Sequence, residues 1–392
     1  MLERKITIPK MKIRRWDWLL VIGLVLAPMT GLRIWKVGPA EVLVLLWCLR
    51  FFSARKIPRN EILQFFALFL GSMALGTIWC LVIARDEIVL SGLSSWIYLM
   101  IAASGMYMGL VRNTVEYNER LLHSFVVVSA IWNIFLYALA RAGARSILGA
   151  PLWFHYRYSA GGLNPHQVAI VMCAVMLLLA REIMKHRHVL WYLLLEVGCG
   201  MVLLATESST ALMAVAVGLV VSGFVSINNC FYQSRSHRHI IILEILIGVL
   251  FVVVFNRLLY RFVYDWIAKD SNGLGRLEIF SRIGETFTKA PLFGLGPGQH
   301  SRVGNVLIEY HNTYLEVIAT SGLVGLYALL RFTLKLLGKL KADNTYLPVV
   351  VALYTYGFAG YGLRRLVYWG VITLVYVITE QKTVAKEHES AC

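Results

Sequence analysis

The sequence predicts an all-α fold: a polytopic membrane bundle of about twelve transmembrane helices, with one large loop that carries short surface helices. Of the 392 residues, 58% are hydrophobic and only 15% are charged, and the mean hydropathy is +0.66. A soluble domain of this size needs far more charge to cover its surface. Apolar runs of about 20 residues, the length that crosses a bilayer, recur along almost the whole chain.

The apolar runs form two groups of membrane helices on either side of one long loop. We predict nine spans within 1–256, a loop at 257–311, and three spans with a tail within 312–392. The predicted spans are 18–33, 38–53, 62–84, 88–111, 121–140, 165–180, 189–206, 209–227, 240–256, 312–333, 346–363 and 366–380. The basic N-terminus leads directly into the first run, so we expect no cleavable signal peptide.

The charges of the connecting loops predict the orientation in the membrane. The loops rich in Lys and Arg alternate along the chain and fall on the same side as the basic N-terminus. By the positive-inside rule this side is cytoplasmic, and a protein with twelve spans then has both termini inside. Most of the Lys and Arg residues behind the net charge of +16 lie in these loops, where they can contact anionic membrane lipids. The sequence has no soluble basic domain that would bind nucleic acid.

The opposite side has two long loops, 141–164 and 257–311. A loop as long as the second, without a domain of its own, is usually functional. Part of this loop has an amphipathic pattern that predicts a helix lying along the membrane surface. The apolar face of that helix consists of Leu277, Phe280, Ile283 and Phe287. A turn-rich run from Pro291 to Gly298 follows it.

The first candidate functional stretch runs from Arg157 to His166. Asn164 suits a helix N-cap and Pro165 suits the first helical position, so the sixth span is expected to start there. Arg157 then lies a few residues outside the membrane. It could bind a substrate, or it could simply contact lipid headgroups at the membrane rim.

Two further stretches complete the candidate site. Arg276 and Arg282 belong to the predicted surface helix, where they could also serve as general phospholipid contacts. His311 is placed at the start of the tenth span, on one helix face with Gly322 and Gly325, which permit close packing of helices. An imidazole facing the bundle interior can accept a proton from a hydroxyl near neutral pH.

Neither a metal ion nor another cofactor is predicted. The sequence has no DxD or DxE pair, no His/Cys/carboxylate cluster with metal-binding spacing and no GxxxxGK[ST] loop. The six cysteines form no CxxC, and most lie within apolar runs as small core residues. Arginines can replace a metal in diphosphate chemistry, because a guanidinium binds phosphate oxygens through two parallel hydrogen bonds and stays charged. Arginines beside a histidine would suit the displacement of a lipid diphosphate from a sugar.

Four stretches together resemble the O-antigen ligase and O-antigen polymerase superfamily over roughly residues 150–335. They are Arg157…Gly161…Asn164-Pro165, Thr206-Glu-Ser-Ser-Thr-Ala211, Arg276…Pro291-Leu-Phe-Gly-Leu-Gly-Pro-Gly298 and His311-Asn312…Gly322…Gly325. The resemblance implies an inverting, metal-independent glycosyltransferase of the bacterial inner membrane. It implies a donor glycan on undecaprenyl diphosphate and a periplasmic active site. The acceptor would be lipid A-core in a ligase and the growing glycan in a polymerase.

The resemblance also implies roles for individual residues. His311 would be the base or would orient the acceptor, and Arg157 and Arg276 would hold the diphosphate. Asn164, Asn312 and Gly322 would support the site. Many members have a basic residue where this chain has Ser209, so one phosphate contact is either missing or supplied by Arg282.

Three alternatives stay open at the level of the sequence. The motifs do not separate a ligase, which we favour, from a polymerase. A transporter of lipid-linked glycans is expected to have paired halves with broken helices in matching positions, and the sequence shows neither. A non-catalytic scaffold of a polysaccharide-assembly complex would tolerate replacement of His311.

Overall fold

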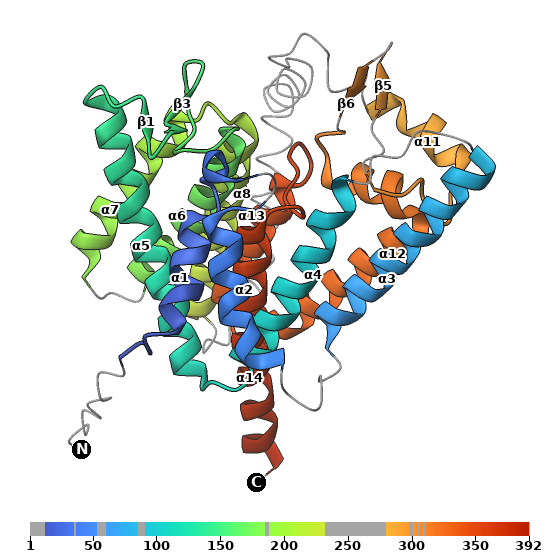
Figure 1. Ribbon diagram of the computed structural model, residues 1–392. Helices are drawn as coiled ribbons and strands as arrows, with labels where there is room; N and C mark the ends of the chain where they lie inside the picture. Colours follow the sequence, from blue (N-terminus) through green and yellow to red (C-terminus); the bar gives the residue numbers. More distant parts are fainter. Residues whose placement is uncertain are drawn as a thin grey trace, which may run out of the picture.

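Helices make up nearly all of the regular structure in the computed structural model (Figure 1). It describes residues 12–34, 37–52, 60–84, 91–184, 188–231, 280–297, 301–303, 306–308 and 310–391. The α-helices are α1 (Asp17–Leu26), α2 (Pro39–Phe52), α3 (Glu61–Trp79), α4 (Ser91–Leu110), α5 (Val115–Arg141), α6 (His166–Met184), α7 (Val189–Ala205), α8 (Ser209–Phe231), α11 (Ile283–Lys289), α12 (Thr313–Leu340), α13 (Leu347–Tyr356) and α14 (Leu366–Ala391). Three antiparallel hairpins pair β1 (Ser146–Ile147) with β2 (Ala150–Pro151), β3 (Trp153–Phe154) with β4 (Arg157–Tyr158), and β5 (Ser301–Val303) with β6 (Val306–Ile308). The predicted all-α class is confirmed.

Several helices are long and apolar enough to cross a membrane. Among the described residues six meet this condition: Glu61–Val82, Leu93–Leu110, Val115–Arg141, His166–Met184, Ser209–Asn229 and Thr313–Leu340. α1 and α7 are apolar but shorter. The chain is therefore a polytopic membrane protein, while the number of twelve spans stays a prediction. Eleven of the twelve predicted spans contain a helix, and the run 240–256 lies outside the described residues.

The two ends of the bundle differ in what they carry (Figure 1). α1 begins and α14 finishes at one end, which we call the terminal end. The hairpins β1–β2, β3–β4 and β5–β6, together with α11, lie at the opposite end, which we call the hairpin end. The two loops that the sequence predicts on the non-cytoplasmic side thus supply the hairpin end.

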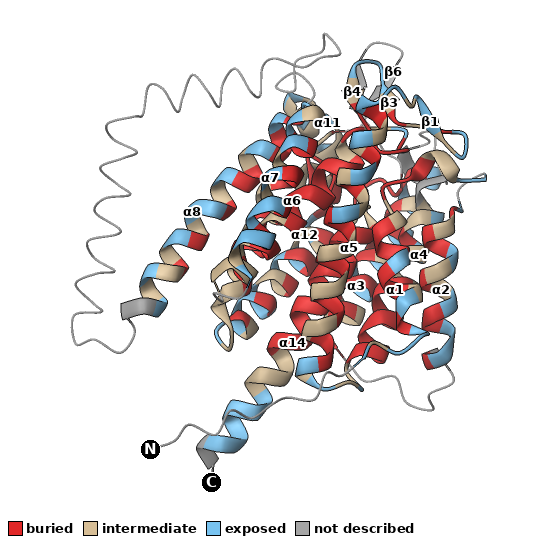
Figure 2. Cartoon of the chain, turned by 90° about the vertical axis from the view of Figure 1, so that its left-hand side faces the viewer, coloured by how far each residue is buried: buried red, intermediate tan, exposed pale blue. Residues whose placement is uncertain are grey.

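The core is built around α6 and the first half of α14, both of which are buried nearly all round (Figure 2). The Trp369 ring of α14 packs at a tilt against the rings of Phe65 and Phe66 of α3, with centroids 5.2 and 4.6 Å apart. α14 also packs against α4, α5 and α12. A helix that is apolar on every side is expected in such a central position. α14 continues well beyond the predicted span 366–380, and its last turns are polar and exposed.

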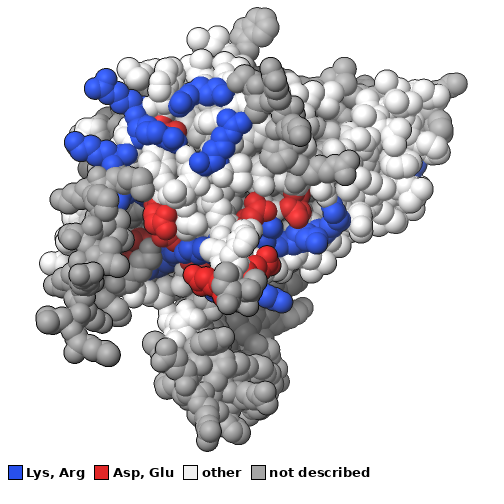
Figure 3. All heavy atoms as spheres, turned by 90° about the horizontal axis from the view of Figure 1, so that it is seen from below, with Lys and Arg blue, Asp and Glu red and all other residues white. Residues whose placement is uncertain are grey.

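An ion-pair network ties the helices together at the terminal end, where acidic and basic side chains gather (Figure 3). Arg181 of α6, only 7% exposed, lies 3.3 Å from both Glu119 and Asp343. Lys382 of α14 reaches the same two carboxylates at 2.6 and 2.7 Å. The network joins α5, α6, α14 and the α12–α13 connection, so it fixes these elements relative to one another.

α12 is broken at Gly322, whose φ of +58° and ψ of −156° are not helical. The Ala290–Pro297 segment, which we call the wedge loop, fills this break. Its N–H groups at Leu295 and Gly296 donate to the carbonyls of Ala319 and Thr320 at 2.8 and 3.1 Å. In return, the N–H groups of two residues after the break donate to the loop. These bonds run from Leu323 to Pro291 at 2.9 Å and from Val324 to Leu292 at 3.1 Å.

The break therefore leaves these backbone groups satisfied, as a buried or membrane-embedded position requires. Ser72 of α3 completes the arrangement by donating to the carbonyl of Ser321 at 2.7 Å. The predicted continuous helix face through His311, Gly322 and Gly325 is wrong. α12 starts only at Thr313, and the chain changes direction at Gly322.

Candidate functional site

The connection between α13 and α14 organises the hairpin end. α13 finishes at Tyr356, so the predicted span 346–363 is too long, and we call Gly357–Arg365 the outer linker. Because it is irregular, its carbonyl groups are open to bonds from other elements. The Thr313 N–H of α12 donates to the carbonyl of Gly357 at 2.7 Å, and the Thr210 hydroxyl of α8 donates to that of Ala359 at 3.1 Å.

The start of α6 is tied to the same place. The Tyr356 hydroxyl, just before the outer linker, donates to the carbonyl of His166 at 3.1 Å. Asn164 accepts a hydrogen bond from the His166 N–H at 2.9 Å, which confirms the predicted helix start. The His166 ring lies 3.0 Å from the hydroxyl of Ser208, and Ser208 lies directly before α8. The starts of α6, α8 and α12 therefore converge on the outer linker.

Arg157 of β4 lies at the turn between α7 and α8. Its Nε donates to the carbonyl of Thr206 at 2.9 Å and its Nη2 to that of Glu207 at 3.3 Å. Carbonyls at the end of a helix carry partial negative charge, so this position favours a cation. A guanidinium has five N–H donors, and these two bonds fix its orientation while using only two of them. Ser209 is exposed at the start of α8.

Asn312 and His311 form the entry to α12. The Asn312 side chain caps the helix by accepting from the N–H groups of Tyr314 and Leu315 at 2.9 and 3.1 Å. Its amide also donates to the carbonyl of Phe358 in the outer linker at 2.8 Å. His311 precedes the cap with φ +49°, a conformation uncommon for a residue with a side chain. Its ring is half-buried, and no described residue hydrogen-bonds it.

The short helix α11 covers the second half of the predicted surface helix, whose first part, with Leu277, lies outside the described residues. Arg282 lies directly before α11 and is half-buried. The Thr286 hydroxyl of α11 lies 2.7 Å from the hydroxyl of Tyr310, the residue next to His311. Arg282 and His311 thus belong to two segments that are joined directly. Arg276, the third predicted diphosphate ligand, lies outside the described residues.

The outer linker differs from the helix predicted there, although its composition carries a signal against a helix. The stretch 357–365 contains three glycines, at 357, 360 and 362, and ends in Arg364-Arg365. Glycines at this density are unfavourable inside a helix. Two adjacent arginines are also unexpected here, because this end of the predicted span lies on the non-cytoplasmic side. Within the described part of the chain, no group of three or more His, Cys, Asp or Glu residues is placed to hold a metal ion.

Fold and site together define a polytopic membrane protein whose polar and basic groups gather around one linker at one end of the bundle. Residues 194–330 match the model of a protein family described as O-antigen ligase. The chain thus contains an O-antigen ligase family domain, and this family consists of glycosyltransferase-type enzymes that imply a lipid-linked glycan substrate. The match covers the α7–α8 turn, the wedge loop, His311 and Gly322, but neither Arg157 nor the outer linker. No curated protein matches the chain.

Proposed function

We propose that this protein is an O-antigen ligase of the bacterial inner membrane. It transfers a glycan from undecaprenyl diphosphate to a hydroxyl of lipid A-core at the periplasmic face, without a metal ion and with inversion at the sugar carbon. One observation supports the proposal most directly: three stretches far apart in the sequence, around Asn164, Ser208 and Asn312, converge on the end of α13 and the outer linker that follows it.

The residues of the site fit the two halves of such a displacement. His311 takes the proton of the acceptor hydroxyl as that oxygen forms its bond to the sugar carbon. The bond from the same carbon to the diphosphate oxygen breaks, and arginines stabilise the charge left on the diphosphate. Arg157 is suited to this because its guanidinium is already oriented by two backbone carbonyls. Arg282 and Arg276 are the other proposed ligands.

The lipid-linked glycan that accumulates in a deletion strain distinguishes a ligase from a polymerase of the same superfamily. A deletion strain of a ligase accumulates full-length glycan on its lipid carrier. A strain lacking a polymerase accumulates single repeat units. Accumulation of neither would contradict both enzyme assignments.

His311 is tested by single-turnover transfer in nanodiscs. His311→Ala should lower the transfer rate by about 10²–10⁴-fold, as expected when a general base is removed. His311→Gln keeps a hydrogen-bonding group but accepts no proton near neutral pH, so it should be nearly as slow as alanine. Substantial activity of the glutamine variant would mean that His311 only orients the acceptor. A wild-type rate for the alanine variant would remove His311 from the mechanism.

A further inference from the structure

A polar cavity opens at the hairpin end, beyond the groups assigned above to the donor. It has a volume of about 610 Å³, which is within the usual range of ligand sites. Its described lining comes from the α1–α2 connection, the starts of α2, α4 and α6, the outer linker and α14. Arg157, Arg282 and His311 do not line it. It is therefore separate from the proposed diphosphate site, although both adjoin the outer linker.

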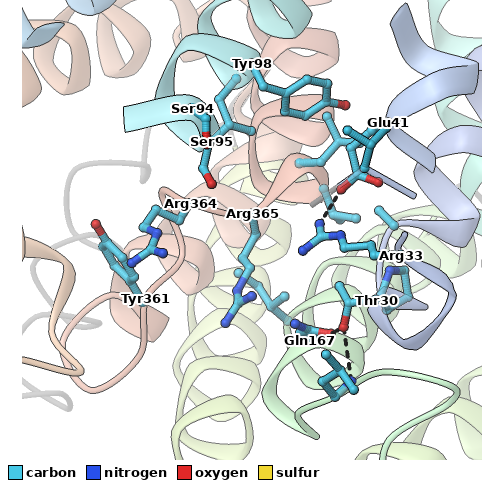
Figure 4. A pocket seen from close by; sticks show the side chains of 18 of the residues that line it. Thr30, Arg33, Glu41, Ser94, Ser95, Tyr98, Gln167, Tyr361, Arg364 and Arg365 are labelled. Atoms are coloured by element: carbon cyan, nitrogen blue, oxygen red, sulfur yellow. Dashed lines mark hydrogen bonds and ion pairs between the residues drawn. The ribbon is translucent and has the colours of Figure 1, made fainter. Parts of the chain in front are cut away.

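The lining of this cavity is positively charged. Arg33 reaches it from the α1–α2 connection, and Arg364 and Arg365 reach it from the outer linker (Figure 4). Among the described lining residues Glu41 is the one carboxylate, and it is paired with Arg33. The described part of the lining therefore has three guanidiniums and one carboxylate, whatever other hydrogen bonds the guanidiniums make. Arg364 lies over the ring of Tyr361, 5.0 Å from the ring centroid, and Arg365 lies beside Gln167 (Figure 4).

Polar groups without charge complete the lining. Gln167 is buried and, with its amide oxygen turned towards Arg365, accepts a hydrogen bond from Arg365 Nη1 at 3.1 Å. In this orientation of the amide, Gln167 holds one side of the guanidinium. The Tyr98 hydroxyl is buried and has no hydrogen-bond partner among the described residues. Buried hydroxyls usually find a partner, so Tyr98 offers a donor that a ligand can use.

We propose that this cavity binds a phosphate group of the acceptor glycolipid. The inference rests on the proposed function, which requires two lipid-linked substrates to meet at one end of the protein. Arginine is a preferred protein group for phosphate because one guanidinium can form two parallel charge-assisted hydrogen bonds to the phosphate oxygens. The outer linker then has one side for each substrate: its first residues hold Asn312 beside His311, and its last residues hold the acceptor phosphate.

Binding to the full-length protein in nanodiscs of phosphatidylcholine tests the proposal. The probes are fluorescent lipid A with both phosphates and the same glycolipid without phosphate. Arg365→Gln and Arg364→Gln should each weaken binding of the phosphorylated probe by about 10- to 100-fold, the loss expected for one charge-assisted hydrogen bond. The dephosphorylated probe should bind weakly to every variant. Arg145→Gln, an exposed arginine near the β1–β2 hairpin, is the matched control and should bind like the wild type.

A variant that blocks the cavity keeps the test valid if the arginine variants fail to fold. Ser94 is exposed and lines the cavity, so Ser94→Trp should fill the cavity and weaken binding of the phosphorylated probe without removing a charge. Unchanged affinity in all three cavity variants would overturn the proposal. Equal competition by phosphatidylglycerol would assign the cavity to a membrane lipid, and competition by undecaprenyl diphosphate would assign it to the donor. Either result would refute an acceptor site.

Transfer kinetics separate this inference from the proposed function. In the cavity variants the KM for the acceptor should rise while the KM for the donor stays within about twofold of the wild type. A wild-type protein that binds the phosphorylated probe but transfers no glycan would refute the proposed function and leave phosphate binding in place. A protein that transfers glycan with an unchanged acceptor KM in the variants would refute the cavity inference alone.

Discussion

Replacing Gly322 with alanine should destabilise the protein strongly. Gly322 has φ +58° and ψ −156°, a backbone region almost restricted to glycine, where a side chain costs about 1–3 kcal/mol. The new Cβ would also lie 2.4 Å from the carbonyl carbon and oxygen of Leu292. These are backbone atoms, so the whole wedge loop must move to make room.

Movement of the wedge loop weakens the hydrogen bonds that fill the break in α12. The N–H groups of Leu323 and Val324 donate to the loop at 2.9 and 3.1 Å, and one buried group left unsatisfied costs about 1–3 kcal/mol. Backbone strain and one lost bond together give a destabilisation of about 4 kcal/mol. At about 2 °C per kcal/mol for a large domain, the apparent Tm should fall by about 8 °C.

The assay is a thermal scan of purified protein in detergent, followed by intrinsic fluorescence and by retention of the monodisperse peak. Gly338→Ala is the matched control in the same helix, because its added Cβ would meet no atom within 4 Å. Alanine is the better helix former by about 1 kcal/mol, so this variant should be as stable as the wild type or slightly more stable. A Gly322→Ala protein that melts within about 2 °C of the wild type would refute the account of the break.

Four further predictions concern the site, the orientation and the terminal end. Arg157→Lys keeps the charge but loses the fork that binds two carbonyls, so glycan transfer should fall at least about tenfold with normal membrane insertion; near-normal transfer would favour a headgroup contact. Transfer by the purified protein should survive EDTA, and a loss that Mg²⁺ or Mn²⁺ restores would contradict arginine-based catalysis. A cysteine introduced at the exposed position of Ser146 should react with an impermeant maleimide in spheroplasts, whereas one at the exposed position of Lys341 should react only after permeabilisation. The opposite labelling pattern would show that the predicted topology is inverted. Burial alone would raise the pKa of Asp343, but the hydrogen bonds from Lys382 and Thr345 and the nearby positive charges lower this pKa to about 2. The ionised carboxylate therefore adds about 2 kcal/mol to the free energy of unfolding above pH 4, and this contribution is lost as the pH falls from about 4 to 2. Asp343→Asn should lower the Tm at pH 7, and the difference in Tm from the wild type should shrink towards pH 2.

The membrane helices and two of their starting points could be predicted because the signals are local. Hydrophobic runs gave the positions of eleven helices. Asn164 and Asn312 are polar residues placed directly before apolar segments, as helix caps are, and both accept hydrogen bonds from the first N–H groups of their helices. The site residues could be grouped from the sequence because their stretches follow one another in the same order as the family's motifs. The structure adds the physical link, since both caps lie beside the outer linker.

The break in α12 and the outer linker could not be predicted in the same way, because both depend on contacts between distant segments. The residues around Gly322 have the composition of an ordinary membrane helix. They leave helical geometry because the wedge loop, about 30 residues earlier in the chain, supplies the missing hydrogen bonds. α13 stops at Tyr356 for a similar reason: the carbonyls that follow accept bonds from α8 and α12 instead. Hydropathy cannot detect such partners.

The placement of the helix starts also explains how a site at the hairpin end can attract an anion without a metal ion. α6, α8 and α12 all begin beside the outer linker, so the positive ends of three helix dipoles point towards the same region. Such N-termini are favourable for phosphate, and Arg157 adds a full positive charge at the α7–α8 turn. At the terminal end the charges are arranged differently, because Arg181 and Lys382 are matched there by carboxylates of Glu119 and Asp343. The three helix starts and Arg157 therefore favour an anion at the hairpin end, as the proposed lipid-linked donor requires, while the ion-pair network at the terminal end holds α5, α6 and α14 together.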